Sequence, residues 1–500
     1  MNDRPELDEI ASLIRSQAPI LLVASHEEPR VRALFERACA QLDKALFTWS
    51  ITDGIRRAGR DDAVYETNEL NSALRHIDKT PQDGVYLLCD AHPGFEDPVN
   101  CRLIREIALE HHKTSRTLVF LSPSLDEVPT PIARLALRFA PMRPTRDEIH
   151  AILSEEAQLW SRQNGEKPKG DRQSIDAMVM HLCGLEQDDV RRLIRQALRA
   201  DGEINQQDVQ QLLRTKHDLL GGDGSLSYEP QTLNFGQVGG LAKLKHWLAL
   251  RRQPFVDNQG SDRPKGVLLL GVQGGGKSLA ARAIAGEWGL PLMRLDFGAL
   301  YNKFQGETER NVRSAFAAAD GMAPCVLWID EIEKGVSGDS STSDGGVSRR
   351  VLGSFLTWLS ERQAPVFVVA TANDISELPP ELIRKGRFDE IFFVDFPQAA
   401  SREQILSIHL AKRGHDCAAF DLKALAAACE GYSGAEIEQA IVSAGFESRA
   451  RGAVGIEQAD ILAEITRTRP LSVVMAERIG ALRHWASTRA VMADEPAAAA

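Results

Sequence analysis

Residues 271–278 read Gly-Val-Gln-Gly-Gly-Gly-Lys-Ser and directly follow the apolar run 267–270. A buried strand, a glycine-rich turn and a helix form the order that aims backbone N–H groups and the positive end of a helix dipole at an anion. In such a loop the lysine reaches the β- and γ-phosphates, and the serine hydroxyl binds Mg²⁺. The stretch therefore predicts a nucleoside triphosphate site. Its predicted binding residues are Gly271, Gln273, Gly274, Gly275, Gly276, Lys277, Ser278 and Leu279.

A second stretch, Val-Leu-Trp-Ile-Asp-Glu at 326–331, ends an apolar run in two carboxylates. Such a run is typical of a strand inside a parallel sheet that helices cover on both faces. We expect Asp330 beside Ser278, where it completes the Mg²⁺ shell, and Glu331 where it polarises the attacking water. The alternative is an acidic pair that only caps a helix. The 54 residues between the two motifs (330 minus 276) accommodate a strand and two helices, which favours a doubly wound sheet.

Length and composition limit the classes of protein to which the chain can belong. Five hundred residues with 43% apolar content predict about three domains with packed cores. There is no apolar run of transmembrane length, and the acidic N-terminus is unlike a targeting segment. Seven scattered cysteines without a CxxC pair are typical of reduced thiols. We therefore expect a cytoplasmic protein that does not associate with membranes.

Charge is uneven along the chain. Residues 1–230 hold 29 basic and 38 acidic side chains, a balance of −9, whereas residues 231–500 hold 30 and 32, a balance of −2. Phosphate contact needs a basic surface, so this acidic balance makes a nucleic-acid partner less favoured, although it leaves room for a local basic channel.

The two halves of the chain resemble each other at a nearly constant offset. The matched positions are 20–24 with 267–270, Asp90 with Asp330 (offset 240), Ser122 with Thr371 and Phe139 with Phe388 (offset 249), and Gly184 with Gly431 (offset 247). Such offsets predict two units of one fold. The first half has no glycine nest and no lysine at 25–30, so we expect it to bind no nucleotide and to serve as a docking or assembly module.

The second half, over about residues 230–470, resembles an AAA+ ATPase module. Besides the two stretches above, the matching segments are 235–241, 372–373, 382–389 and 431–437. The resemblance implies that Gly239 lies against the adenine, and that Gly434 and Ala435 begin a lid helix at the base and ribose. It also implies that Asn373 senses the γ-phosphate and helps to position the lytic water.

The same resemblance implies that Arg384 and Arg387 reach into the site of a neighbouring subunit. A guanidinium supplied in trans can raise hydrolysis by several orders of magnitude, so an isolated chain should be nearly inactive. The family expectation is a ring or spiral of about six subunits. The alternative is that both arginines are surface cations that flank a turn.

Residues 303–307, Lys-Phe-Gln-Gly-Glu, resemble the pore loop with which unfoldase members grip a polypeptide. An aromatic such as Phe304 contacts any extended chain through apolar area. Gln305 departs from the family, where an aliphatic residue is common. The alternative is that Phe304 packs in the core.

The whole chain resembles a narrower group, the chloroplast- and bacteria-encoded AAA proteins known as hypothetical chloroplast reading frame forty-six. Residues 271–274, 326–334 and 470–472 carry this resemblance. The expected fold class is α/β: a P-loop AAA+ module with a doubly wound parallel sheet and a small helical lid, preceded by a degenerate AAA-like α/β domain with its own helical lid. The expected domains are a degenerate domain without a nucleotide site (1–150), a lid-like helical subdomain (151–218), a linker (219–236), the large ATPase subdomain (237–398), its lid (399–470), and a C-terminal helix with a frayed tail (471–500).

In that C-terminal segment, Ile479, Leu482 and Trp485 recur at helical spacing, and we expect them to pack on the lid or on a neighbour. The predicted function is a Mg²⁺-dependent ATPase that assembles with itself and couples ATP hydrolysis to remodelling or threading of a protein substrate. Two alternatives remain open. An ATP-switched scaffold would turn over slowly, with no acceleration by polypeptides, whereas a nucleic-acid-linked ATPase would respond to DNA or RNA in a salt-sensitive way.

Overall fold

A computed structural model describes most of the chain. The described residues are 3–60, 62–125, 128–220, 224–257, 262–297, 308–336, 345–375, 378–384, 386–453 and 455–494. They form two compact units, one of Met1–Lys169 with Leu182–Glu203, the other of Gly170–His181 with Ile204–Ala500. The predicted helical segment 151–218 contributes to both. The two-residue strands β7 (Lys169–Gly170) and β8 (Glu203–Ile204) fall where the chain passes from one unit to the other.

The first unit contains a six-stranded sheet in the order β3-β2-β4-β5-β1-β6. Its strands are β1 (Ile20–Ala24), β2 (Leu46–Ser50), β3 (Gly54–Arg57), β4 (Gly84–Cys89), β5 (Arg116–Ser122) and β6 (Ala136–Phe139). Its helices are α1 (Arg4–Arg15), α2 (Glu28–Gln41), α3 (Leu70–Lys79), η1 (His92–Glu96), α4 (Pro98–Leu109), α5 (Thr130–Ala133), α6 (Arg146–Asn164) and α8 (Gln187–Asp201).

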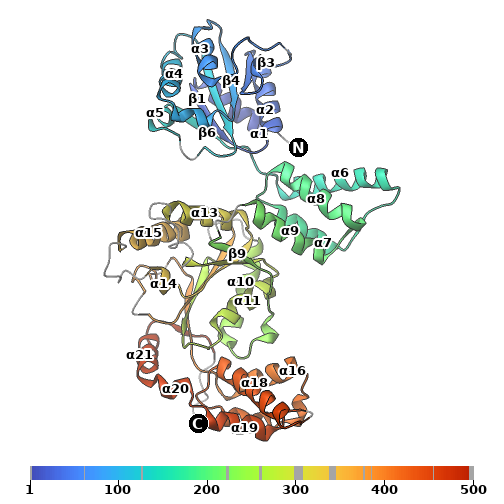
Figure 1. Cartoon of the computed structure of the whole chain (residues 1–500), viewed down its shortest axis with the longest axis vertical. Helices are drawn as coiled ribbons and strands as arrows, with labels where there is room; N and C mark the ends of the chain where they lie inside the picture. Colours follow the sequence, from blue (N-terminus) through green and yellow to red (C-terminus); the bar gives the residue numbers. More distant parts are fainter. Residues whose placement is uncertain are drawn as a thin grey trace. The chain divides into compact units, whose positions relative to one another are not determined.

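Both faces of this sheet are buried. Leu21 and Val23 of β1 pack with α1 and α2 on one face, while Ile20 and Leu22 pack with α3 and α4 on the other. Figure 1 shows these helix pairs on opposite sides of the strands. Because successive side chains of a strand point to opposite faces, an unbroken apolar strand requires this double cover.

The second unit contains a seven-stranded sheet in the order β15-β14-β10-β13-β12-β11-β9. Its strands are β9 (Leu226–Glu229), β10 (Gly266–Gly271), β11 (Leu292–Leu295), β12 (Cys325–Ile329), β13 (Val366–Ala372), β14 (Glu390–Val394) and β15 (Val491–Met492). The helices of this part are α7 (Arg172–Leu182), α9 (Gln206–Leu219), η2 (Phe235–Gln237), α10 (Ala242–Asp257), α11 (Lys277–Trp288), α13 (Thr308–Gly321), α14 (Glu333–Val336) and α15 (Gly345–Glu361). Figure 1 shows α10 and α11 on one side of the sheet and α13 and α15 on the other.

A helical lid and a C-terminal segment complete the second unit. They comprise α16 (Ala399–Lys412), η3 (Cys417–Ala419), α17 (Leu422–Ala428), α18 (Gly434–Ala450), α19 (Gln458–Arg467), α20 (Leu471–Val474) and α21 (Ala476–Ala486). The lid has its own core, in which Leu406, Leu425, Ile437 and Ile461 are buried.

The two sheets have one topology, which confirms the predicted pair of doubly wound α/β units. Reading β6-β1-β5-β4-β2 beside β14-β10-β13-β12-β11 gives the same strand order, all parallel. Each sheet then adds an antiparallel edge strand, β3 or β9. These edge strands differ in origin, because β3 follows β2 in a hairpin whereas β9 precedes the nucleotide loop.

The structure tests two of the matched positions, Asp90 with Asp330 and Phe139 with Phe388. β4 pairs with β5 from Gly84, and β12 pairs with β13 from Cys325, so the sixth residue after each start is Asp90 and Glu331. These two residues share an unusual positive φ, 51° and 49°. The predicted match of Asp90 with Asp330 holds for the side-chain contact, since Ser122 Oγ donates to Asp90 Oδ1 at 3.2 Å as Thr371 does to Asp330 Oδ1. In backbone conformation, however, Asp90 resembles Glu331. The match of Phe139 with Phe388 was wrong, since Phe139 lies in β6 and Phe388 precedes β14.

The C-terminal segment differs from prediction. In α21, Ile479 packs with Val272 and Phe396 beside the sheet and not on the lid. After α21 the chain adds β15 to the sheet edge, parallel to β14. The last described residue, Asp494, accepts a hydrogen bond from Ser401 Oγ at 2.6 Å, so the expected fraying does not begin before it.

Candidate nucleotide-binding site

The loop between β10 and α11 depends on its glycines. A Cβ at Gly271 would lie 2.0 Å from Val394 O, which leaves room for glycine alone. Gly274 and Gly276 have φ values of 75° and 95°, a region that side chains other than glycine rarely adopt. The turn therefore brings the N-terminus of α11 close to the strand end with its first N–H groups free to face an anion.

Lys277 lies over this loop. Its side chain is buried, and Nζ donates hydrogen bonds of 2.8 Å to Gly271 O and to Val272 O. Burial lowers the pKa of Lys277 to about 8, against the opposing effect of Glu333 and then Asp330. The ammonium is thus held at the loop by carbonyl oxygens that a phosphate can replace.

Asp330 and Ser278 meet as predicted. Ser278 Oγ donates to Asp330 Oδ1 at 3.3 Å. Thr371 donates to the same oxygen at 2.7 Å and accepts the backbone N–H of Glu331 at 3.0 Å. A hydroxyl and a carboxylate are hard oxygen ligands that suit Mg²⁺, so the donor set fits that ion. Thr371 entered the sequence comparison only as a repeat marker, and its role here was missed.

Glu331 is held on two sides. Asn373 Nδ2 donates to its Oε1 at 2.9 Å, and Lys334 forms an ion pair with its Oε2. The backbone N–H of Asn373 in turn donates to Glu333 Oε1 at 2.9 Å. Burial raises the pKa of Glu333, whose other oxygen is buried without a hydrogen bond. Sequence reasoning assigned no role to Glu333 and Lys334, although both lie in the quoted stretch 326–334.

These groups line one cavity of about 290 Å³. From the loop it takes Gln273, Gly274, Gly275, Gly276, Lys277, Ser278 and Leu279, and from the strand ends Asp330, Glu331, Thr371 and Asn373. Gly271 contributes through its carbonyl. The structure thus brings together the predicted phosphate, metal and sensor residues of a single chain.

The opposite walls of the cavity come from distant segments. Gly239 lies in the wall, and a Cβ there would meet Ile405 Cγ1 at 2.6 Å. Gly434 and Ala435 begin α18, and Ala435 N donates to Gly274 O at 3.3 Å. All three were predicted. No motif or spacing in the sequence indicated the wall residues Ile405, Ile408, His409 and Glu438.

Arg384 and Arg387 do not line the cavity of their own chain. Arg384 is exposed, and Arg387 donates to the carbonyl of Glu381. The pore-loop candidate Phe304 lies outside the described residues.

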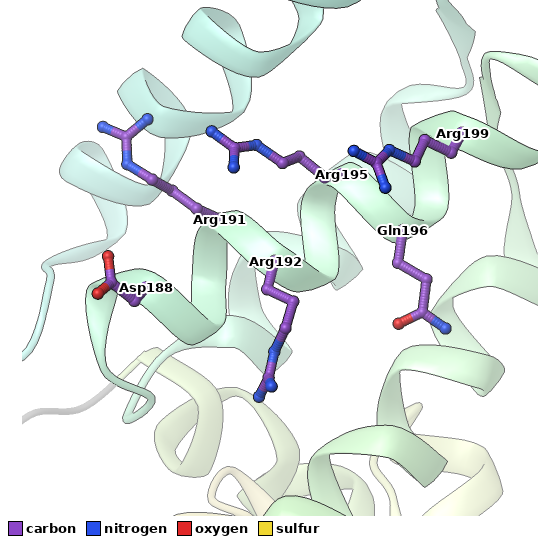
Figure 2. A pocket seen from close by; sticks show the side chains of 6 residues that line it. All are labelled: Asp188, Arg191, Arg192, Arg195, Gln196 and Arg199. Atoms are coloured by element: carbon purple, nitrogen blue, oxygen red, sulfur yellow. The ribbon is translucent and has the colours of Figure 1, made fainter. Parts of the chain in front are cut away.

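A larger hollow of about 670 Å³ lies along α8 in the first unit, lined by Asp188, Arg191, Arg192, Arg195, Gln196 and Arg199. Figure 2 shows Arg191, Arg195 and Arg199 projecting on one side of the helix and Arg192 and Gln196 on the other. Carboxylates already pair with three of the arginines, Arg191 and Arg195 with Glu156 and Arg192 with Asp189. The hollow takes its lining from one helix and lacks a converging set of catalytic groups.

In the first unit, the connection from β1 to α2 lies where the second unit has its phosphate loop, and it contains a buried carboxylate of the chain. Only residues 25–27 separate β1 from α2, against 272–276 between β10 and α11. Glu27, 2% exposed, accepts from Arg30 Nη1 at 2.8 Å and from Asp188 N, at the start of α8, at 2.8 Å. A carboxylate of the chain itself thus joins the loop to the lid-like helix.

Most of the chain matches domains of known protein families. Residues 267–396 match the ATPase family associated with various cellular activities (AAA), and residues 419–463 match the AAA+ lid domain. Residues 6–140 and 147–223 match the N-terminal and second domains of SpoVK-like AAA ATPases.

Relatives agree over nearly the whole length. The chain is 35% identical to the uncharacterized AAA domain-containing protein ycf46 of Guillardia theta over 95% of this chain and 94% of the relative. It is 34% identical to that of Pyropia yezoensis over 96% and 97%. The proteasome-activating nucleotidase of Aeropyrum pernix is 37% identical over 42% of this chain and 52% of its own. The chain therefore belongs to the AAA family of ATP hydrolases and, along nearly its whole length, to the group of AAA proteins named ycf46.

Proposed function

We propose that the cavity around Lys277 is the ATP site, and that assembled chains couple hydrolysis there to remodelling of a protein substrate. The observation that carries the proposal is the convergence of Ser278, Asp330, Glu331 and Asn373 on one cavity whose other wall is the lid. Phosphoryl transfer needs this set, because its catalysis is positioning and charge stabilisation.

Each residue then has a distinct task. Lys277 exchanges its two carbonyl partners for phosphate oxygens. Ser278 and Asp330 hold Mg²⁺, which supplies positive charge to the phosphates. Glu331 polarises the attacking water, and Asn373 keeps the Glu331 carboxylate oriented through its amide.

We infer that hydrolysis is accelerated by a further positive charge from a neighbouring chain, because a guanidinium supplied in trans stabilises the transition state of phosphoryl transfer. Arg384 is exposed and Arg387 half-buried, and neither lines the cavity of its own chain. We assign both to the site of a neighbouring copy in a ring or spiral. A head-to-tail interface of this kind repeats until it closes or continues as a helix.

A protein substrate is favoured by the relatives. One relative is named a proteasome-activating nucleotidase, and another is the ATP-dependent zinc metalloprotease FtsH 2 of Bdellovibrio bacteriovorus, 33% identical over 47% of this chain and 40% of its own. We assign Phe304 to the contact with an extended polypeptide. In the part of the chain that the structure describes, no helix has the length and apolar character needed to cross a membrane. We place the protein in the cytosol.

We assign the first unit to docking or assembly, without a nucleotide site of its own. Its loop of three residues is too short for a phosphate nest, and Ala91 follows Asp90 where Glu331 follows Asp330.

The deciding experiment uses Glu331→Gln, with the exposed Glu361→Gln as the matched control. The variant should bind a labelled adenine nucleotide, lose hydrolysis and accumulate as oligomers that retain their substrate. Recovery of bound polypeptide from Glu331→Gln but not from Glu361→Gln supports remodelling. Turnover near wild type in Glu331→Gln removes this site from the reaction, and retention of nucleic acid alone overturns the protein substrate.

A further inference from the structure

A second cavity of about 270 Å³ adjoins the nucleotide cavity. The two share Gln273, Glu331 and Asn373, so the second cavity opens at the hydrolytic end of the first. Its far wall is C-terminal, with Leu471, Met475, Arg478, Ile479 and Leu482 from α20, α21 and the residue between them.

This C-terminal wall is fixed at its start. Leu471 N donates to Glu436 Oε1 at 2.8 Å, which ties α20 to the first turn of the lid helix α18. One turn into α21, Ile479 is buried against Val272 of the nucleotide loop. The C-terminal segment therefore contacts the lid through α20 and the nucleotide loop through α21.

The wall is fixed at its end as well. Beyond α21, Ala493 N donates to Phe393 O at 2.9 Å, which continues the pairing of β15 with β14. Asp494 then accepts from Ser401 Oγ at 2.6 Å and from Ala242 N at 3.1 Å. Because both ends are tied down, α21 holds its side chains at set positions beside the site.

One of those side chains faces the sensor segment. Arg478 Nη2 donates to Asp374 Oδ2 at 2.6 Å, and Asp374 directly follows Asn373. Among the described residues that line this cavity, the cations are Arg478 and Lys334. Lys334 pairs with the carboxylate of Glu331, and Arg478 pairs with the segment whose amide orients that carboxylate.

We propose that Arg478 is a positioning residue for ATP hydrolysis, which acts in cis by holding Asp374 and thereby the Asn373 amide on Glu331. The proposal rests on the roles proposed above for Asn373 and Glu331. The ion pair is largely exposed, with Arg478 58% and Asp374 22% accessible, and such pairs add little to folding stability. Its loss should therefore affect turnover and not the fold.

The same helix provides a matched control. Arg483 forms a two-bond ion pair with Asp395 at 2.8 and 2.9 Å, and its side chain is 50% exposed. Asp395 follows β14 and lines neither cavity. Arg478→Ala and Arg483→Ala thus remove equivalent charges from one helix at different distances from the chemistry.

The test measures kcat and KM for ATP in the full chain. Arg478→Ala should lower kcat about tenfold or more, the scale of a small misplacement, with little change in KM. Arg483→Ala should match wild type, and Arg478→Lys should recover part of the rate. Asp374→Ala should reproduce the loss, and the double variant should be no worse than either single variant. Wild-type kcat in Arg478→Ala overturns the proposal, and so does a loss that Asp374→Ala does not share.

A second measurement is independent of turnover. The backbone N–H of Asn373 donates a hydrogen bond to Glu333. Hydrogen exchange at this backbone N–H therefore reports how well the segment is ordered. Exchange should accelerate in Arg478→Ala and stay unchanged in Arg483→Ala. If wild type itself hydrolyses no ATP, the function proposed above fails, while equal exchange in both variants still overturns the positioning role.

Discussion

Thr371 carries one hydroxyl that contacts both residues of the acidic pair. It donates to Asp330 and accepts from the backbone of Glu331, and the side chain is buried. Thr371→Val keeps the shape and removes both bonds. We expect unfolding to become easier by about 1–3 kcal/mol, because a buried donor and acceptor lose their partner. Hydrolysis should fall at least about tenfold with ATP binding retained.

Denaturant titration and steady-state kinetics check this expectation. Thr371→Ser restores the hydroxyl and should recover both properties. A valine variant with wild-type kcat would show that strand geometry alone places the two carboxylates.

Glu27 stabilises the first unit from inside. Its carboxylate joins Arg30 to the backbone N–H of Asp188, and Arg30 also forms a two-bond pair with the buried Glu6. Glu27→Ala leaves a guanidinium and an N–H without this partner, which should cost about 3–5 kcal/mol of unfolding free energy. Glu36→Ala, which removes a half-exposed pair with Arg32, should cost about 1 kcal/mol or less.

Denaturant unfolding of the two variants measures this difference. Equal losses for Glu27→Ala and Glu36→Ala would show that the buried carboxylate does not secure α8.

At the scale of elements, α7 and α9 meet through buried polar groups. Lys216 Nζ donates to His181 O at 2.7 Å, and both side chains are buried. Burial, followed by the charge of Lys216, lowers the pKa of His181 to about 3. An unfolded chain therefore protonates this histidine near pH 6.5 while the folded chain does not. Stability that is present above pH 6.5 should be lost as the pH falls towards 3.

His181 should contribute about 1.4 kcal/mol per pH unit below pH 6.5, in addition to the contributions of His111 and His409, whose pKa values burial also lowers. Urea unfolding between pH 5 and 7 gives the measurement, because few carboxylates titrate in that range. His181→Gln should flatten the slope, whereas the exposed His484→Gln should leave it unchanged. A His181→Gln curve parallel to wild type would place the acid sensitivity elsewhere.

Element-scale geometry also explains how much the sequence could predict. The loop at 271–278 and the strand at 326–331 are contiguous, and each carries its chemistry in one run. Their meeting followed from the rule that parallel strands present their carboxyl ends at one edge. The wall residues Ile405 and His409 come from one face of α16, where an apolar or half-buried side chain reads as ordinary lid packing.

The structure of the C-terminal segment was harder to predict from the sequence than the lid residues were. β15 is two residues long and Arg478 makes one exposed ion pair, so neither leaves a periodic signal. The repeat comparison found the right fold but could not place Asp90 fully, because two acidic residues follow β12 and one follows β4. The contact of Asp90 with Ser122 matches that of Asp330 with Thr371, whereas its positive φ matches that of Glu331, and neither feature can be read from the sequence.

At the scale of the whole molecule, the proposed site is complete only when two chains meet. Glu331→Gln inactivates the cavity of its own chain but leaves its arginines intact. Arg387→Ala leaves the cavity intact but removes a group that we assign to the neighbour's site. Each variant alone should be nearly inactive, since a guanidinium supplied in trans is worth several orders of magnitude. In an equal mixture, an Arg387→Ala cavity that faces a Glu331→Gln neighbour is competent.

Random assembly of that mixture makes about one interface in four competent, half of the cavities times half of the neighbours. Mixing the two inactive proteins should therefore restore up to about a quarter of wild-type ATPase activity, with a rate that depends on protein concentration. Mixing Glu331→Gln with Lys277→Ala is the control. Both variants spoil the cavity and keep the arginines, so this mixture should recover nothing. Activity in Arg387→Ala alone, or no recovery in a mixture that light scattering shows to be assembled, would mean that the arginine does not complete the neighbour's site.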